Sequence, residues 1–221
     1  MTRTLKYTSR APISGTTKSI VVLLHGYGAN GADLMGLADP LGPNLKDTAF
    51  FAPDAPETIP GAPFGFQWFP IPWIDGSSEA QAEAGLKLAS EDLNAFLDDI
   101  LVENDVAPEN CVLLGFSQGT MMALHVAPRR AKPFAGVVAF SGRLLAPEKL
   151  AQETVSKPPV ILIHGDKDDV VPIQSMADAG DALVAAGFDV YAHVMEGTAH
   201  GIGPDGLSSA NQFLMQKLGY I

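Results

Sequence analysis

The stretch from Cys111 to Ala123 constrains the fold more than any other part of the chain. It combines a short apolar run, a Gly-x-Ser-x-Gly motif and the start of a helical pattern. Between a strand and a helix, this motif forms a tight, strained turn that exposes Ser117 above a sheet. Gly115 and Gly119 leave space where a side chain would collide with the strand or the helix. The helix would then begin beneath Ser117, with its N–H groups facing any developing negative charge.

Composition limits the class of protein. The 221 residues are 47% apolar, which is enough for one substantial core, so we expect a single α/β domain over residues 1–221. The net charge of −11 argues against nucleic acid or an anionic membrane as a partner. Cys111 is the only cysteine and lies in the apolar run. It therefore predicts neither a disulfide nor a reactive thiol, and a small buried hydrophobe fits better.

The N-terminal residues 1–12 include basic side chains but no apolar segment typical of a signal peptide. No apolar run approaches the roughly 20 residues of a membrane span. We therefore expect a soluble, cytoplasmic protein without stable membrane insertion. It would act as a monomer or a homodimer.

Apolar runs alternate with helical patterns along the whole chain, which predicts a doubly wound and mainly parallel sheet. In such sheets the functional site lies at the carboxyl ends of the strands. The expected strands cover residues 19–25, 48–52, 111–114, 134–140, 160–164 and 188–195. The expected helices cover residues 30–37, 79–102, 173–187 and 207–218, together with one that starts at residue 120.

The segment 53–78 is rich in both proline and aromatic residues. Proline at this density argues against a helix or a central strand, so an irregular loop is expected. Two interpretations stay open with even weight: a loop pinned to the core, or an apolar lid that walls a substrate pocket. In the second interpretation Phe66, Trp68, Trp73 and the more distant Leu144 are candidate substrate contacts.

A glycine-rich loop follows the first predicted strand and reads His-Gly-Tyr-Gly-Ala-Asn-Gly from His25. It lacks the spacing of the known nucleotide-binding loops. A better interpretation is a loop whose backbone amides face Ser117, with the N–H of Tyr27 forming half of an oxyanion hole. His25 would then shape the loop.

A serine hydroxyl needs a base to take its proton, and the base needs an acid to orient it. His200 is the preferred base, because it lies in a glycine-rich loop after the last predicted strand. His193 lies within a strand, and His164 precedes the acidic loop, which gives the wrong chain order for this fold. His125 is interpreted as a packed helix residue.

The acid comes from Asp166, Asp168 or Asp169, and the residues alone do not choose among them. The same cluster could suggest a metal site, but its spacing matches no known calcium or zinc motif. We therefore expect no metal and no organic cofactor.

Four motifs in order, spread over residues 19–218, give the chain a specific resemblance. They are Leu-His-Gly-Tyr-Gly, Gly-Phe-Ser-Gln-Gly, His-Gly-x-x-Asp-x-x-Val-Pro and a late histidine, beginning at Leu24, Gly115 and His164 and ending with His200. The sequence resembles the phospholipase/carboxylesterase family of α/β-hydrolases, which includes small carboxylesterases and acyl-protein thioesterases. This chain has Asp169 where family members often carry proline.

The resemblance implies Ser117 as nucleophile, Asp168 as acid and His200 as base. It also implies an oxyanion hole formed by the backbone N–H groups of Tyr27 and Gln118. On this interpretation the side chain of Gln118 is replaceable. A small-molecule carboxylic ester of short to medium chain length is the expected substrate.

Independently of any family, residues 141–159 are too few for the cap domain that many hydrolases of this fold insert there. A minimal α/β-hydrolase fold without a cap is therefore predicted. Two other functions stay open. A thioesterase or lysophospholipase would use the same chemistry, and a non-catalytic binding protein could keep the same fold.

Overall fold

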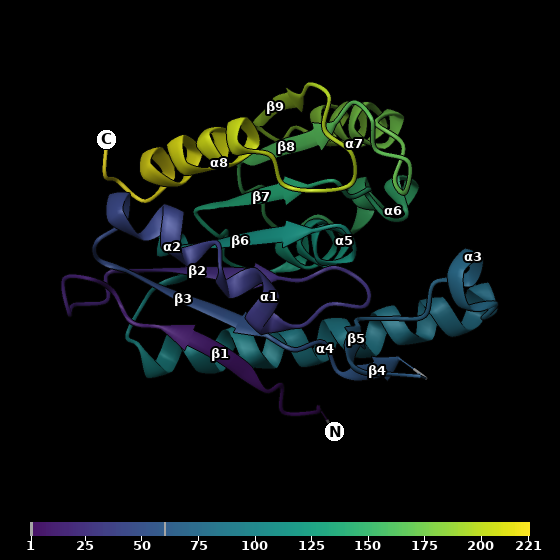
Figure 1. The fold of residues 1–221 in the computed structure, drawn as a ribbon, viewed down its shortest axis with the longest axis horizontal. Helices are drawn as coiled ribbons and strands as arrows, with labels where there is room; N and C mark the ends of the chain where they lie inside the picture. The colour runs from purple at the N-terminus through teal and green to yellow at the C-terminus, as the bar shows by residue number, and fades with distance from the viewer. Residues whose placement is uncertain (1, 60) are drawn as a thin grey trace.

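A seven-stranded sheet forms the centre of the computed structural model, which describes residues 2–59 and 61–221. Its strand order is β1-β3-β2-β6-β7-β8-β9, and all neighbours are parallel except the edge pair β1 and β3 (Figure 1). The strands are β1 (Tyr7–Arg10), β2 (Ser19–Leu24), β3 (Thr48–Pro53), β6 (Cys111–Phe116), β7 (Gly136–Phe140), β8 (Val160–Gly165) and β9 (Val190–Met195). The predicted mainly parallel sheet is confirmed. The exposed strand β1 was not predicted, because its short polar sequence carries no apolar pattern.

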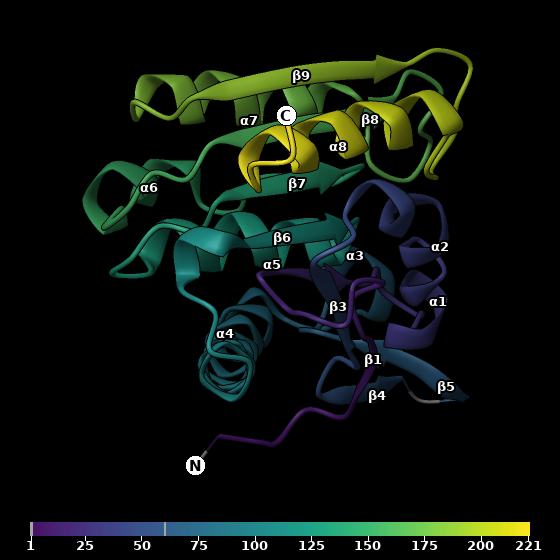
Figure 2. The same cartoon turned by 90° about the vertical axis from the view of Figure 1, so that its left-hand side faces the viewer.

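Helices cover both faces of the sheet, as expected for a doubly wound fold (Figure 2). One face carries α1 (Gly31–Met35), α2 (Ala38–Leu41) and α8 (Pro204–Lys217). The other carries α4 (Glu79–Glu103), α5 (Gln118–Val126), α6 (Pro147–Glu153) and α7 (Gln174–Ala185). Three single 3₁₀ turns span Gly42–Asn44, Pro108–Asn110 and Ala127–Arg129.

Strand β2 shows why the sheet needs both layers. All six of its residues are buried. Ile20 and Val22 pack with α4 and α5, whereas Val21 and Leu23 pack with α1, α2 and α8. A strand that is apolar on both faces is stable only between two layers of helices.

The helix starts follow the sequence closely. The hydroxyl of Ser78 accepts a hydrogen bond from the amide of Gln81, whose side chain in turn accepts from the amide of Ser78. Asn30 and Asp33 form the same reciprocal capping box at the start of α1. Each box satisfies amides that have no partner within the helix.

The prediction of an irregular loop over residues 53–78 was wrong. Two short strands, β4 (Glu57–Ile59) and β5 (Ala62–Gln67), form a separate antiparallel hairpin, and α3 (Pro72–Asp75) follows. Proline is tolerated in a two-stranded ribbon that has free edges and at the first position of a helix. Pro72 occupies that position in α3. The proline-rich composition therefore ruled out a central strand but not these elements.

Within the described residues only α6 is inserted between β7 and β8, so no cap domain lies there, as predicted. Among the described residues no helix is both long enough and apolar enough to cross a membrane. In the same part of the chain, no group of three or more His, Cys, Asp and Glu side chains is arranged to hold a metal ion.

Candidate active site

The site lies where the direction of strand addition reverses. From β2 the chain adds β3 on one side, and from β6 it adds β7, β8 and β9 on the other. The connections leaving β2 and β6 therefore diverge and open a crevice at the carboxyl ends of these strands. The loop that begins at His25 and the turn at Ser117 lie at this point.

Ser117 adopts a strained backbone conformation, with φ 53° and ψ −114°. Its amide donates to the carbonyl of Phe140 at 2.9 Å, and its carbonyl accepts from the amide of Met121 at 3.2 Å. The turn is thus held both to the neighbouring strand and to the first turn of α5. Strain of this kind persists only where the surroundings impose it, and it clusters at functional sites.

Glycines allow the strand and the helix to approach this closely. A Cβ on Gly119 would lie 1.8 Å from the carbonyl oxygen of Leu24, and one on Gly115 would lie 2.4 Å from the amide nitrogen of Thr120. The hydroxyl of Thr120 bonds the carbonyls of Gly115 and Phe140 at 2.8 and 2.7 Å. The sequence reasoning did not identify this bracing role of Thr120.

The structure brings Asp168 and His200 together. Oδ2 of Asp168 lies 2.7 Å from Nδ1 of His200, and Oδ1 accepts from the amides of Val170 and Val171 at 2.9 and 2.8 Å. Burial alone would raise the pKa of Asp168, but the hydrogen bonds from His200, Val171 and Val170 outweigh it and hold the pKa below its ordinary value. The carboxylate is therefore ionised and fixed in orientation.

The other two aspartates of the loop lie elsewhere. Asp166 accepts from the amide of Gly197 at 2.6 Å and pairs with Lys167, so it braces the loop that carries His200. Asp169 is exposed. Of the three aspartates, Asp168 is the one that contacts His200 among the described residues.

The remaining histidines occupy other positions. His193 pairs with Asp205 at 2.9 Å near the start of α8. His164 is buried, with Nε2 2.8 Å from the carbonyl oxygen of Val171 and 3.3 Å from Oδ2 of Asp168. It thus holds the acidic loop, a role that its place at a strand end did not reveal.

Ser117 and His200 share one edge of the sheet. The ring of Phe116, which directly precedes Ser117, lies 4.9 Å from the imidazole of His200 between ring centres. Among the described residues the hydroxyl of Ser117 makes no hydrogen bond. In enzymes without bound substrate, the nucleophilic serine and the histidine base are commonly farther apart than hydrogen-bond distance.

Two amides near the serine turn have no backbone acceptor within the described residues. Gln118 is the first residue of α5, so its N–H has no partner within the helix. Within the described residues the N–H of Tyr27 also has no acceptor, whereas its neighbour Gly28 donates to Phe66 at 2.9 Å. Phe66 donates back to Ala29 at 2.9 Å, so the β4–β5 hairpin holds the Tyr27 loop by its backbone.

Trp68 was predicted to contact substrate, and the structure contradicts this. Its side chain is fully buried, and its indole N–H donates to the carbonyl of His25 at 3.0 Å. Its amide donates to Oε1 of Gln118 at 2.9 Å, while Nε2 of Gln118 donates to the carbonyl of Phe69 at 2.7 Å. The Gln118 side chain is therefore not freely replaceable, because it ties the serine turn to the aromatic segment.

His25 completes this buried network. Its Nε2 accepts from the amide of Ala55 at 2.9 Å, so Nδ1 carries the proton and donates to the carbonyl of Gly26 at 2.8 Å. Burial lowers the pKa of His25, which keeps the ring neutral. The predicted shaping role of His25 thus has a defined hydrogen-bond basis.

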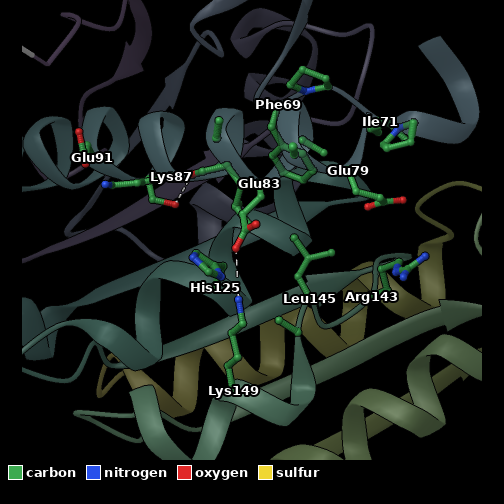
Figure 3. A pocket seen from close by; sticks show the side chains of 18 of the residues that line it. Phe69, Ile71, Glu79, Glu83, Lys87, Glu91, His125, Arg143, Leu145 and Lys149 are labelled. Carbon is green, nitrogen blue, oxygen red and sulfur yellow. Dashed lines mark hydrogen bonds and ion pairs between the residues drawn. The ribbon is translucent and has the colours of Figure 1, made fainter. Parts of the chain in front are cut away.

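A groove of about 880 Å³ runs between α4, the segment 69–73 and the region from Arg143 to α6. Figure 3 shows Arg143 and Glu79 at one end, Lys87 and Glu91 at the other, and the Lys149–Glu83 ion pair between them. Phe69 and Leu145 supply apolar surface within it. The groove therefore combines an apolar lining with charged ends.

The other three predicted substrate contacts lie in different parts of the structure. Trp73 is 60% exposed and lines this groove, and Leu144 lines a smaller cavity of about 310 Å³. Phe66 lines neither of these two cavities and packs partly against the core.

Comparison with known proteins shows the family to which this chain belongs. The sequence profile of the phospholipase/carboxylesterase family matches residues 11–218. The chain belongs to this family.

Relatives of the family agree with that assignment. Acyl-protein thioesterase 1 of Kluyveromyces lactis is 29% identical over 218 residues, covering 91% of this chain and 92% of the relative. Esterase YpfH of Escherichia coli K12 is 27% identical over 205 residues, covering 92% and 83%. The crystal structure of esterase PE8 matches with a TM-score of 0.92 and 42% identity, covering 98% of this chain and all of that one. As a member of this α/β-hydrolase family, the chain is an enzyme that hydrolyses esters or thioesters, and the resemblance seen in its motifs is confirmed.

Proposed function

We propose that this family member is a serine carboxylesterase for esters of short to medium chain length. The observation that carries the proposal is the 2.7 Å contact between Asp168 and His200 beside the strained turn of Ser117. A fixed, ionised acid on Nδ1 directs Nε2 of the same imidazole toward the nucleophile. Deprotonation of a serine hydroxyl requires this arrangement.

The reaction takes two steps. Ser117 attacks the ester carbonyl while His200 accepts its proton, and Asp168 stabilises the imidazolium. The N–H groups of Tyr27 and Gln118 bind the oxyanion, and one such donor contributes about 3 kcal/mol to transition-state stabilisation. His200 returns the proton to the leaving alcohol, then takes one from a water that attacks the acyl-enzyme. Collapse of the tetrahedral intermediate formed by that water releases the acid, and His200 returns the proton to the oxygen of Ser117.

A groove near the serine turn is consistent with the proposed range of substrates. Its apolar residues Phe69, Ile71 and Trp73 suit an acyl chain of several carbons. Ser117 and His200 do not line the groove, but the side chain of Gln118 bonds the carbonyl of Phe69, which ties this wall to the serine turn. The competing function is a thioesterase, which differs only in the leaving group and is favoured by the relative named acyl-protein thioesterase 1.

The first experiment tests the nucleophile. Ser117→Ala should abolish hydrolysis of p-nitrophenyl butyrate and labelling by a fluorophosphonate probe, while Ser208→Ala, at an exposed position in α8, should retain both. Both variants should show the circular-dichroism spectrum of the parent. Substantial turnover by folded Ser117→Ala would refute the assignment.

A second experiment separates the two substrate classes. Butyryl, hexanoyl, octanoyl and palmitoyl groups are offered both as p-nitrophenyl esters and as thiocholine esters, and kcat/KM is measured for each. We expect ester turnover to be greatest at butyryl or hexanoyl. A maximum at palmitoyl on the thioester would favour the thioesterase.

A further inference from the structure

Arg143 is placed beside the nucleophile by the chain that leaves β7. The preceding residue, Gly142, packs directly on the serine turn. A Cβ on Gly142 would lie 2.8 Å from the carbonyl oxygen of Ser117 and 2.4 Å from the side chain of Thr120. Arg143 is the next residue along, and it lines both the large groove and the smaller cavity. The backbone of Arg143 is therefore one residue away from the serine turn, and its exposed side chain lines these two cavities, whose linings do not include Ser117 or His200.

The segment that carries Arg143 is strained at both ends. Ser141 has φ 45° and Ala146 has φ 46°, and they are two of the four non-glycine residues with positive φ in the described chain. The hydroxyl of Ser141 is also buried without a hydrogen-bond partner among the described residues. Both features cost stability, and backbone strain of this kind accumulates where function requires a particular side-chain position.

Charge pairing distinguishes Arg143 from the other arginines. The chain has 25 acidic and 14 basic residues, so potential carboxylate partners are in excess. Within residues 2–59 and 61–221, Arg143 has no carboxylate partner, whereas the other four arginines each have one: Arg3–Asp92, Arg10–Asp39, Arg129–Glu153 and Arg130–Asp98. An exposed arginine without a carboxylate partner among the described residues is thus unusual in this chain, and it directly follows the glycine that packs on the serine turn.

Trp73 holds this guanidinium in place. The Cζ atom of Arg143 lies 5.2 Å from the centre of the Trp73 ring, which is a cation–π distance. Stacking leaves the N–H groups at the edge of the guanidinium free to form paired hydrogen bonds with a carboxylate. The exposed indole also shields one face of such an ion pair from water.

We propose that Arg143, stacked on Trp73, binds an anionic group of the substrate. The preferred substrates are then carboxylic esters that bear a carboxylate several bonds from the scissile carbonyl. This inference rests on the proposed function, because the carboxylate is defined relative to an ester attacked by Ser117.

Carboxylates near Arg143 limit the charge of the group that it can bind, and Asp178 lines the smaller cavity together with Arg143. Glu83 is paired with Lys149, and Glu153 is paired with Arg129. Glu79 lines the same end of the groove as Arg143 (Figure 3). Its carboxylate disfavours a second negative charge there, so a singly charged group fits better than a doubly charged phosphate.

The test compares charged and neutral esters of similar size. Monomethyl glutarate carries a carboxylate on the acyl side of the ester, and methyl pentanoate is its neutral counterpart. 4-Acetoxybutanoate carries a carboxylate on the alcohol side, and butyl acetate is its neutral counterpart. Hydrolysis is followed by pH-stat for the parent, Arg143→Met and Arg10→Met. The last variant removes an equal charge from β1, where Arg10 lies beside the start of β3, at the end of the sheet opposite the site.

Arg143→Met should lower kcat/KM for the charged ester of one pair by about tenfold. The binding free energy that a hydrogen bond to a charged group contributes corresponds to a change of about that size. The neutral esters should change by less than about twofold, and Arg10→Met should behave like the parent. The pair that responds identifies the side of the ester that carries the anion. Addition of 0.5 M NaCl should reduce the parent's preference.

An equal effect of Arg143→Met on charged and neutral esters would overturn the proposal, and so would no effect on either. Hydrolysis of none of the four esters by the parent would instead contradict the proposed esterase function. The two failures are therefore distinguishable. Circular dichroism of Arg143→Met checks that it is folded.

Discussion

The indole N–H of Trp68 donates a hydrogen bond to the carbonyl of His25 at 3.0 Å in the interior of the protein. This bond joins the aromatic segment to the loop that presents the amide of Tyr27. Through its own amide, Trp68 is also bonded to the side chain of Gln118. Trp68 therefore supports both halves of the proposed oxyanion hole without contacting substrate.

Trp68→Phe should retain most of the ring packing but leave the His25 carbonyl without its indole donor. A buried carbonyl without a partner costs about 1–3 kcal/mol. We expect kcat for p-nitrophenyl butyrate to fall about tenfold with little change in KM, since the oxyanion amides act in the transition state. Trp73→Phe is the control for stability, because that ring is exposed. A loss of stability with unchanged kcat would contradict the positioning role.

The side chain of Gln118 makes two buried hydrogen bonds to the aromatic segment. Gln118→Ala would leave the amide of Trp68 and the carbonyl of Phe69 unpaired. We expect the free energy of unfolding to fall by about 2–4 kcal/mol, measured by urea denaturation. Gln174→Ala, at an exposed position in α7, should change it by less than about 0.5 kcal/mol. Similar values for both variants would show that the network contributes little.

His164 holds the loop of Asp168, the proposed triad acid, through Nε2, which lies 2.8 Å from the carbonyl oxygen of Val171. Glutamine can place an amide N–H near that position, whereas leucine cannot. We therefore expect His164→Leu to lower kcat about tenfold or more, and His164→Gln to recover much of the loss. Equal activity of the two variants would show that the hydrogen bond does not position Asp168.

His125 makes stability depend on pH. Its Nδ1 is buried without a partner among the described residues, and burial, aided by Arg129, lowers the pKa of His125 to about 4. Because the unfolded chain protonates this ring near the ordinary histidine pKa of 6.5, the unfolded state binds more protons than the folded state between pH 4 and pH 6.5. The contribution of His125 is complete above about pH 6.5 and is lost as the pH falls toward 4.

His125→Gln removes this titration. Between pH 7 and pH 5 the parent should lose on the order of 1 kcal/mol more stability than His125→Gln, after allowance for the partial exposure of the ring. His25 also makes stability fall as the pH falls, since burial lowers its pKa too. His25 is present in both proteins, so its effect cancels in the comparison. Urea denaturation at the two pH values measures the difference. Parallel losses in both proteins would contradict the assignment to His125.

Local patterns in the sequence determined most of the fold. The apolar run before Ser117 and the two flanking glycines specify strand, turn and helix, because a side chain at either glycine would collide with the backbone. Ser78 and Asn30 mark helix starts through bonds formed within four residues. Such features depend on near neighbours in the chain, so the sequence displays them directly.

Contacts between distant segments had to be decided by the tertiary structure. Without the family resemblance, which implied Asp168, the residues alone did not choose among Asp166, Asp168 and Asp169, and in the structure it is Asp168 that contacts His200, 32 residues away. Trp68 could have faced either solvent or the core. Its burial follows from bonds to His25 and Gln118, 43 and 50 residues distant.

The sequence by itself thus determined the doubly wound sheet, the strained serine turn and the order of the candidate acid and base. Only the tertiary structure decided which carboxylate contacts His200, that Trp68 is buried, and that Arg143 has no carboxylate partner within residues 2–59 and 61–221. The physical reason is that strand and turn patterns depend on short-range sterics and apolar periodicity. Hydrogen bonds and ion pairs depend on which side chains the folded chain brings within about 3 Å of each other.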